Sequence, residues 1–179
     1  MPPQTIIIYS SIDGQTKKIC EYIQSVLNEF REDAKLLSIE DFLQEKLSLD
    51  VFPKIILASS IRYGKHNQEI TALIHQEHQI LQSKTAAFIS VNLVARKKEK
   101  SSYNTNPYVI KFLQTIPWKP TVTAVFAGQL NYKIYSFWDR LLIRLIMKIT
   151  KGPTDPNTDI EYTDWEAVAA FAKKWNSLK

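Results

Sequence analysis

The sequence predicts an α/β protein built on a doubly wound parallel sheet, and two features of the chain predict it. Short runs of β-branched and other apolar residues alternate with longer segments whose apolar residues recur at three- and four-residue steps. This alternation is typical of βαβ units, which place parallel strands in one sheet with helices on both faces. The expected strands are the run that begins at Ile6 and the segments 34–39, 54–60, 85–92 and 121–127.

Helical spacing accounts for most of the segments between these strands. We expect helices over 17–30, 68–82, 108–115 and 164–178, whereas 40–49 fits either a helix or a loop. The one cysteine, Cys20, lies mid-helix between Ile19 and Ile23, so we expect it to pack in the core. No internal repeat interrupts the pattern. At 179 residues, the chain is predicted to be one domain, 1–179.

The first strand leads into a loop that suits a phosphate. Strand, tight loop and helix N-terminus direct unpaired backbone N–H groups and the positive end of the helix dipole to one point. Ser10, Ser11 and Thr16 add hydroxyl groups, and Gly14 lets the backbone approach a ligand closely. The alternative is an ordinary βα turn in which Asp13 caps the helix.

Two nucleotide-binding motifs are excluded at this loop. No Gly-Lys-Ser/Thr ending follows, as a triphosphate-binding loop needs, and one glycine stands where a dinucleotide fingerprint has three. A phosphomonoester is therefore favoured. Two further strands also end in small polar residues, at 59–64 and 90–95. Because the carboxyl ends of parallel strands share one edge of a doubly wound sheet, these loops should converge there and flank a planar group such as flavin mononucleotide (FMN).

The segment Tyr132 to Lys151 is additional to what a minimal five-stranded sheet requires. Its apolar residues follow helical spacing, and its polar face carries five basic residues against one acid, Asp139. We predict a basic amphipathic helix within an insertion, 129–160. Such a helix with aromatic residues near one end suits an anionic membrane surface or a lipophilic ligand. The alternative is a core helix whose charged face is solvated.

The charge of the chain and the motifs it lacks restrict the classes of partner that we expect. Lys and Arg exceed Asp and Glu by 23 − 18 = 5, and the pI is about 9.2, so an acidic partner or an anionic surface is plausible. No nucleic-acid-reading motif accompanies the charge, so we expect no nucleic-acid partner. His75 and His78 lie one helical turn apart without a clear third ligand, so no metal site is predicted.

Five motifs together resemble one family. They are Ser11–Thr16, Ser59–Gly64, Ser90–Lys97, Tyr135–Lys148 and Tyr162–Trp165. The chain resembles the flavodoxin-like, menaquinone-dependent protoporphyrinogen IX dehydrogenases of bacterial haem synthesis over nearly its whole length. The resemblance implies a flavodoxin-like five-stranded sheet of order 2-1-3-4-5. Asp13 departs from the wider flavodoxin pattern, in which a hydroxyl residue commonly precedes the glycine. An acid beside a phosphate is unfavourable unless it points away and caps the helix.

The same resemblance implies the cofactor and its site. FMN would be held by the three loops, with the residues Ser10, Ser11, Asp13, Gly14, Gln15, Thr16, Ser60, Ile61, Arg62, Tyr63, Gly64, Ser90, Asn92, Leu93 and Val94. The cofactor would carry the redox chemistry, so no catalytic acid or base is assigned. The implied reaction removes six electrons from protoporphyrinogen IX in two-electron steps and passes them to menaquinone or ubiquinone.

Our own inference adds two expectations to this implied function. The substrate's propionates should pair with Arg96, Lys97, Lys98 or Arg62, although the segment 96–100 also fits a solvated loop. The helix over 132–151 should bring the protein to an anionic membrane surface, as a peripheral protein on the cytoplasmic face of the bacterial inner membrane.

Three other functions stay open at this stage. A flavodoxin-type electron carrier would share the fold, but such carriers are acidic as a rule and this chain is basic. A nicotinamide-dependent quinone reductase would need a second nucleotide site, for which the sequence has no fingerprint. A flavin-free adaptor that docks on membranes would use the same fold without chemistry.

Overall fold

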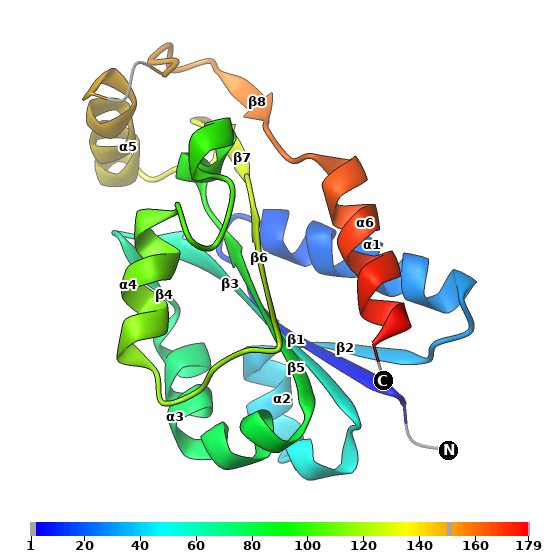
Figure 1. Cartoon of the computed structure of the whole chain (residues 1–179). Helices are drawn as coiled ribbons and strands as arrows, with labels where there is room; N and C mark the ends of the chain where they lie inside the picture. Colours follow the sequence, from blue (N-terminus) through cyan, green and yellow to red (C-terminus); the bar gives the residue numbers. More distant parts are fainter. Residues whose placement is uncertain (1–2, 150–151, 179) are drawn as a thin grey trace.

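A parallel sheet forms the centre of the protein in the computed structural model, which describes residues 3–149 and 152–178 (Figure 1). Its strands are β1 (Thr5–Ser10), β2 (Ala34–Ser38), β3 (Lys54–Arg62), β5 (Thr85–Val91) and β6 (Val122–Phe126). They lie in the order β2-β1-β3-β5-β6, and each neighbouring pair is parallel. Strand β4 (Lys65–His66) adds a short antiparallel hairpin to β3. The predicted order 2-1-3-4-5 is therefore confirmed for the five core strands.

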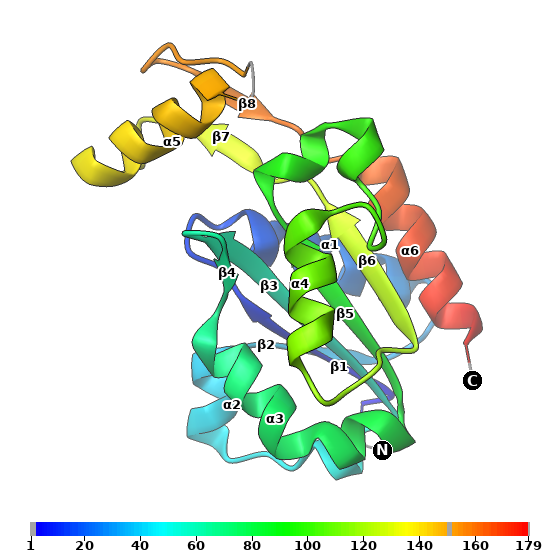
Figure 2. The same cartoon turned by 60° about the vertical axis from the view of Figure 1, so that its left-hand side comes forward.

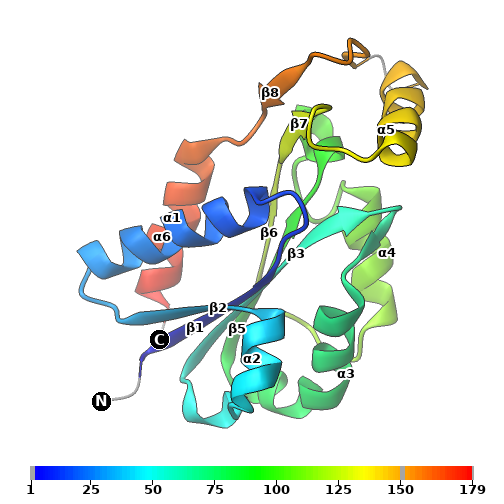
Figure 3. The same cartoon turned by 180° about the vertical axis from the view of Figure 1, so that it is seen from behind.

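Helices cover both faces of this sheet. Helices α1 (Gln15–Glu29) and α6 (Trp165–Ser177) lie side by side on one face. Helices α2 (Ile39–Glu45), α3 (Gln68–Ser83) and α4 (Pro107–Thr115) cover the other (Figure 3). Short 3₁₀ turns complete the chain at η1 (Leu49–Val51), η2 (Leu93–Arg96) and η3 (Lys98–Lys100), so the basic segment predicted as a loop is two such turns.

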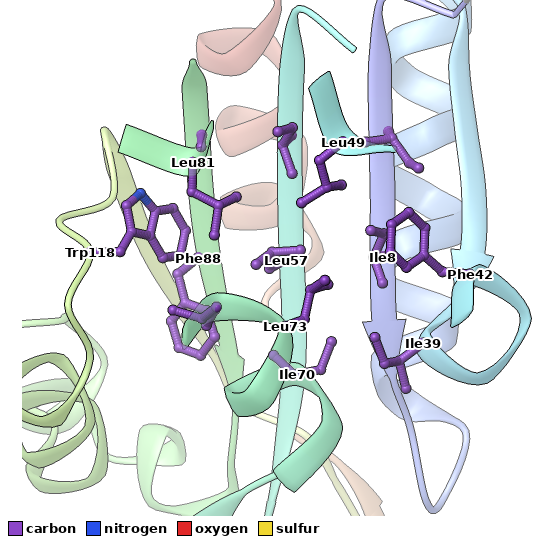
Figure 4. Packing of buried hydrophobic residues seen from close by; sticks show 14 of the residues in the cluster. Ile8, Ile39, Phe42, Leu49, Leu57, Ile70, Leu73, Leu81, Phe88 and Trp118 are labelled. Atoms are coloured by element: carbon purple, nitrogen blue, oxygen red, sulfur yellow. The ribbon is translucent and has the colours of Figure 1, made fainter. Parts of the chain in front are cut away.

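The central strands are apolar on both sides because both faces are covered. On β1, Ile6 and Ile8 pack towards α2 and α3, while Ile7 between them packs towards α1 and α6, and all three are fully buried. Figure 4 shows the first of these layers, in which Leu57 and Phe88 lie between the strands and α3. A continuous apolar run therefore forms a strand here, as predicted.

The segment 40–49, which the sequence left open, begins as helix α2. The Ser38 hydroxyl accepts a hydrogen bond from the backbone N–H of Asp41 at 3.1 Å, which satisfies one of the unpaired groups at the helix start. Ile39 and Phe42 then bury the inner side of the helix against the sheet. The helix ends at Glu45, and Lys46 follows in the left-handed region.

The insertion lies beyond the carboxyl ends of the core strands (Figure 2). Strands β7 (Gln129–Asn131) and β8 (Asp159–Glu161) pair antiparallel, and α5 (Phe137–Ile149) stands between them in the chain. Among the residues that the structure describes, no helix is long and apolar enough to cross a bilayer.

The prediction of a helix from Tyr132 was wrong at its start. Tyr132 and Tyr135 are buried with Leu130 and Met147 in a small cluster of their own, so the chain turns before the helix begins. The Ser136 hydroxyl accepts a hydrogen bond from the backbone N–H of Asp139, which starts α5 at Phe137. The predicted end at Lys151 lies outside the described residues.

Candidate functional site

Loops that follow β1, β3 and β5 meet at a single cavity of about 400 Å³. This is the convergence that the sequence predicted for the carboxyl edge of the sheet. Of the predicted site residues, the cavity is lined by Ser11, Asp13, Gln15, Thr16, Ser60, Ile61, Arg62, Tyr63, Gly64, Asn92, Leu93, Val94 and Arg96. Ser10, Gly14, Ser90 and Lys97 are not part of this lining.

The loop after β1 has unpaired hydrogen-bonding groups turned to the interior. The hydroxyls of Ser11 and Thr16 and the side-chain carbonyl of Gln15 are buried, and none has a hydrogen-bond partner within residues 3–149 and 152–178. The Ser60 hydroxyl, near the carboxyl end of β3, is also buried and has no hydrogen-bond partner among the described residues. Because buried polar atoms are nearly always paired in native proteins, this cluster indicates a polar ligand.

The start of α1 favours a negatively charged ligand. Gly14 precedes the helix with φ at 86°, a backbone conformation that glycine adopts readily. No other atom lies within 4 Å of where its Cβ would be, so the backbone is open to a ligand on this side. The first N–H groups of a helix lack intrahelical partners, and the helix dipole favours an anion at that end. Together with the unpaired hydroxyls of Ser11 and Thr16, the helix start fits a phosphate group.

The alternative in which Asp13 caps α1 was wrong. The N-cap residue is Gly14, and no side chain of the described residues caps this helix; Asp13 instead forms an ion pair with Arg62 at 3.3 Å. Burial raises the pKa of Asp13, and the Arg62 guanidinium opposes that rise. The carboxylate therefore has a cationic partner beside the loop.

The loop after β3 is a tight hairpin turn that carries an exposed tyrosine. Tyr63 and Gly64 connect β3 to β4, and both have positive φ, at 50° and 76°. Hairpins with two-residue turns favour such angles because they match the strand twist. The Tyr63 ring is largely exposed, but its hydroxyl donates a hydrogen bond to Asp139 of α5. The turn therefore contacts the insertion across the mouth of the cavity.

Arg62 joins the cavity's two sides. Its guanidinium pairs with Asp13 of the first loop and with Asp139 of α5. Hydrogen bonds from Ser136 and Tyr63, together with the charge of Arg62, hold the pKa of Asp139 below its usual value. Arg62 was one of the four predicted partners of a substrate carboxylate, and in the structure its guanidinium contacts these two carboxylates.

The loop after β5 is supported by a buried chain of hydrogen bonds. Ser90 does not line the cavity; its hydroxyl lies 2.9 Å from His66 Nε2 and accepts a hydrogen bond from Asn92 at 3.1 Å. Asn92 accepts in turn from Asn106 and from the backbone N–H of Ala95. Burial lowers the pKa of His66 to about 3, so this ring is neutral at pH 7. Ser90 and His66 therefore fix the loop on which Asn92 faces the cavity.

Sequence reasoning missed the wall that α5 contributes. Asp139, Leu142, Ile143, Ile146 and Met147 all line the cavity, as do Tyr108, Gly128, Gln129 and Tyr135. The signal for one of them was present, because Asp139 is the single acid in a basic helix and stands three residues after a serine, as a helix-capping pair does.

The arrangement is that of a ligand-binding cavity. One part of its lining consists of hydroxyls and a helix N-terminus, and the wall from α5 is mainly apolar apart from Asp139. Among the described residues, no group of three or more His, Cys, Asp or Glu side chains is placed to hold a metal ion. A phosphorylated cofactor that brings its own reactivity fits this site better than a side-chain nucleophile does.

Comparison with known proteins agrees with this geometry. The family model described as flavodoxin domain matches residues 6–157. The Escherichia coli (strain K12) protein named protoporphyrinogen IX dehydrogenase (quinone) is 39% identical over 171 residues, which cover 96% of this chain and 93% of that one. A Leishmania major protein of the same name is 40% identical over 177 residues, which cover 98% of this chain and 76% of that one.

A solved structure with a similar backbone supports the assignment of the fold and nothing beyond it. Oxidised flavodoxin 1 from Bacillus cereus superposes with a TM-score of 0.53 and covers 98% of this chain and 99% of its own, at 15% identity.

Proposed function

Because the chain belongs to the flavodoxin domain family, and within it to the protoporphyrinogen IX dehydrogenases that use a quinone, we propose that it oxidises protoporphyrinogen IX to protoporphyrin IX. The electrons pass to a respiratory quinone, menaquinone or ubiquinone, and the cofactor is FMN. Each two-electron step takes two electrons and two protons from the porphyrinogen and turns one quinone into one quinol. The six-electron oxidation therefore yields three quinols per porphyrin.

The observation that carries the proposal is the set of unpaired buried hydroxyls around the start of α1 and the carboxyl end of β3. Ser11, Thr16 and Ser60 would donate hydrogen bonds to the FMN phosphate, and Gln15 Oε1 would accept one from a cofactor hydroxyl. Tyr63 on the hairpin turn and the 92–94 loop would enclose the flat ring from two sides. When bound, FMN supplies the two-electron chemistry, and the protein supplies binding and orientation.

Two basic residues are proposed to hold the substrate's propionates. Arg96 lines the cavity, and its Nη1 donates a 2.9 Å hydrogen bond to the Leu93 carbonyl, which fixes the guanidinium beside the loop. Lys97 follows it in the chain and does not line the cavity. Replacing both by Ala should raise the KM for protoporphyrinogen about tenfold or more, since each charge-assisted hydrogen bond contributes roughly 1.5–3 kcal/mol. An unchanged KM would remove this assignment.

Helix α5 is proposed to dock on an anionic membrane. Its outer side exposes a broad apolar surface, the α5 apolar arc, made of Phe137, Trp138, Leu141, Leu142, Leu145, Ile146 and Ile149. Trp138 is 74% exposed and Phe137 is 71% exposed. Arg144 and Lys148 lie exposed along the same helix, with Arg140 half-buried. Large exposed apolar patches with a basic rim are typical of membrane contact surfaces.

Magnitudes indicate that the apolar side chains dominate this docking. Moving one large apolar side chain fully out of water stabilises by roughly 1.5–3 kcal/mol, whereas each Lys or Arg near an anionic surface adds about 1 kcal/mol. We therefore propose a peripheral protein on the cytoplasmic face of the inner membrane, where lipophilic quinones and porphyrinogens reside.

Vesicle binding tests the docking surface with a matched control. Leu145 of the arc and Val51, which lies in η1 at the opposite end of the sheet, are each 55% exposed. Leu145→Gln should weaken co-sedimentation with anionic phospholipid vesicles, and Val51→Gln should not. Equal binding of both variants and the unmodified protein would overturn the docking proposal.

An anaerobic assay tests the reaction itself. FMN-loaded protein mixed with protoporphyrinogen IX and menadione should produce fluorescent protoporphyrin IX, and addition of NADH or NADPH should not be needed. A colourless protein that takes up no FMN would contradict the cofactor. Menadione reduction that depends on NAD(P)H and leaves protoporphyrinogen unchanged would support a quinone reductase in its place.

A further inference from the structure

Two residues of the α5 apolar arc belong to two surfaces at once. Leu142 and Ile146, one helical turn apart, line the cavity, and they are also 38% and 40% exposed. The other members of the arc, Phe137, Trp138, Leu141, Leu145 and Ile149, do not line the cavity. Leu142 and Ile146 therefore make an apolar connection between the interior of the site and the outer face of α5.

Most of the side chains that α5 contributes to the cavity are apolar. They are Leu142, Ile143, Ile146 and the fully buried Met147, whereas Asp139, the polar one, is paired with Arg62. The unpaired hydroxyls of Ser11, Thr16 and Ser60 are those assigned above to the FMN phosphate. The α5 side therefore fits a second ligand that carries a long apolar chain, because the chain can leave the site over apolar side chains.

We propose that Leu142 and Ile146 form the exit path for the isoprenoid tail of the quinone and so determine the enzyme's preference for tailed over tailless acceptors. The proposal rests on the proposed quinone-dependent function and extends it. The quinone ring would lie inside the cavity, and the tail would leave it over these two side chains directly into the bilayer that the α5 apolar arc contacts, without lying along Leu145 or Ile149. A tailed quinone would then enter from the bilayer without passing through water.

The orientation of α5 supports this path. Asp139 pairs with Arg62 and accepts a hydrogen bond from Tyr63, both on the hairpin turn of the site. Met147, two turns further along, is buried against Tyr132 and Tyr135. Contacts at these two points hold the helix so that Leu142 and Ile146, which lie between them in the chain, face the cavity mouth.

Two matched double variants test the path. Leu142→Gln with Ile146→Gln makes the connection polar, while Leu145→Gln with Ile149→Gln makes the same change on the arc away from the cavity. Glutamine is a good helix former, and all four side chains are partly or largely exposed, so both variants should fold; thermal unfolding checks this.

The readout is a ratio measured in detergent micelles, where vesicle binding plays no part. We compare kcat/KM for menaquinone-4, which carries an isoprenoid tail, with kcat/KM for menadione, which has the same ring and none. The Leu142/Ile146 variant should lower this ratio roughly tenfold, as expected when an apolar contact is lost, and the Leu145/Ile149 variant should keep the ratio of the unmodified protein. Calorimetric titration with menaquinone-4 should show a matching rise in Kd for the first variant alone.

The outcomes separate this inference from the proposed function. If the unmodified protein oxidises protoporphyrinogen with menadione but both variants keep its ratio, or both lower it equally, the tail path is wrong and the function stands. If the unmodified protein oxidises protoporphyrinogen with neither quinone, the proposed function fails, and the tail path fails with it.

Discussion

The sheet and the insertion use the same residue types in opposite ways. In the sheet, large apolar side chains such as Ile7, Leu57 and Phe88 are fully buried between strands and helices. In α5, comparable side chains such as Phe137, Trp138 and Ile149 are mostly exposed. The apolar residues follow strand patterning in the sheet and helical spacing in α5. In neither case does the pattern by itself show what covers these side chains.

This difference in exposure indicates what covers the apolar side chains of each region. The chain itself supplies the covering helices for both faces of the sheet, and their removal would expose the core. Within the part of the chain that the structure describes, the side of α5 that carries Asp139, Ile143 and Met147 faces the rest of the protein, and Leu142 and Ile146 stand at its margin. The α5 apolar arc is therefore explained by a partner outside the chain, which we propose to be the membrane with its quinone.

The largest expected effect comes from a pair of aromatic truncations that contrast the two regions. Phe88→Ala should lower the free energy of unfolding by about 3–5 kcal/mol, because it leaves a cavity beside Phe112 and His66. Trp138→Ala should change it by less than about 0.5 kcal/mol, since that ring is exposed. Urea unfolding measures both. A large loss from Trp138→Ala would mean that α5 belongs to the core after all.

Acidification should weaken the sheet region through His66. Burial lowers its pKa to about 3, whereas the unfolded chain keeps a value near 6.5, so the unfolded state binds the proton first as pH falls. The stability that depends on a neutral ring is present above about pH 6.5 and is lost progressively down to about pH 3. Compared with His66→Gln, the unmodified protein should lose about 2 kcal/mol between pH 7 and pH 5.

Urea unfolding of both proteins at each pH gives this difference directly. Because all other titrating groups are common to the two, their contributions cancel. Parallel pH profiles would show that His66 is not held neutral by its surroundings.

The contact between the two regions should respond to Asp139→Asn. The change removes the charge that pairs with Arg62, so α5 should loosen by roughly 1.5–3 kcal/mol, the usual contribution of a charge-assisted hydrogen bond. Hydrogen exchange should become at least about tenfold faster in α5 and stay unchanged in α1. Asp155→Asn, the same substitution at an exposed acid of the insertion, is the control and should leave α5 unaffected.

The smallest effect on stability is expected at the phosphate loop. The Ser11 hydroxyl has no partner among the described residues, so Ser11→Ala should leave the stability of the FMN-free protein nearly unchanged. The same variant should bind FMN about tenfold more weakly, because one hydrogen bond to a charged group is lost. Ser25→Ala, at an exposed site on α1 whose hydroxyl bonds to Tyr22, should change neither quantity. Fluorescence titration of the FMN-free protein with FMN measures the affinity.

Local patterns were sufficient to predict the sheet and the convergence of its loops. The run Ile6–Ile8 identifies a strand covered on both faces, and the serines at or near the carboxyl ends of β1, β3 and β5 mark the edge at which those strands end. These features depend on neighbouring residues and on the common direction of parallel strands, both of which a sequence contains.

Contacts between distant segments were not predictable in the same way. Arg62 meets Asp13 and Asp139, which are 49 and 77 residues away, and no local pattern encodes such a pairing. The short strands β7 and β8 pair across the whole of α5, so neither has a hairpin turn that would reveal it. The true start of α5 was readable, because Ser136 and Asp139 form a capping pair that outweighs the apolar spacing of Tyr132 and Tyr135.

One measurement tests the central claim that the cavity and α5 serve a single reaction. FMN-loaded protein is mixed anaerobically with protoporphyrinogen IX and anionic vesicles that contain menaquinone, and quinol and porphyrin are counted together. We predict three quinols per protoporphyrin, and a markedly slower reaction for Trp138→Gln with Leu145→Gln in the same vesicles. Porphyrin formed without quinol, or equal rates for a variant that no longer binds vesicles, would contradict the account.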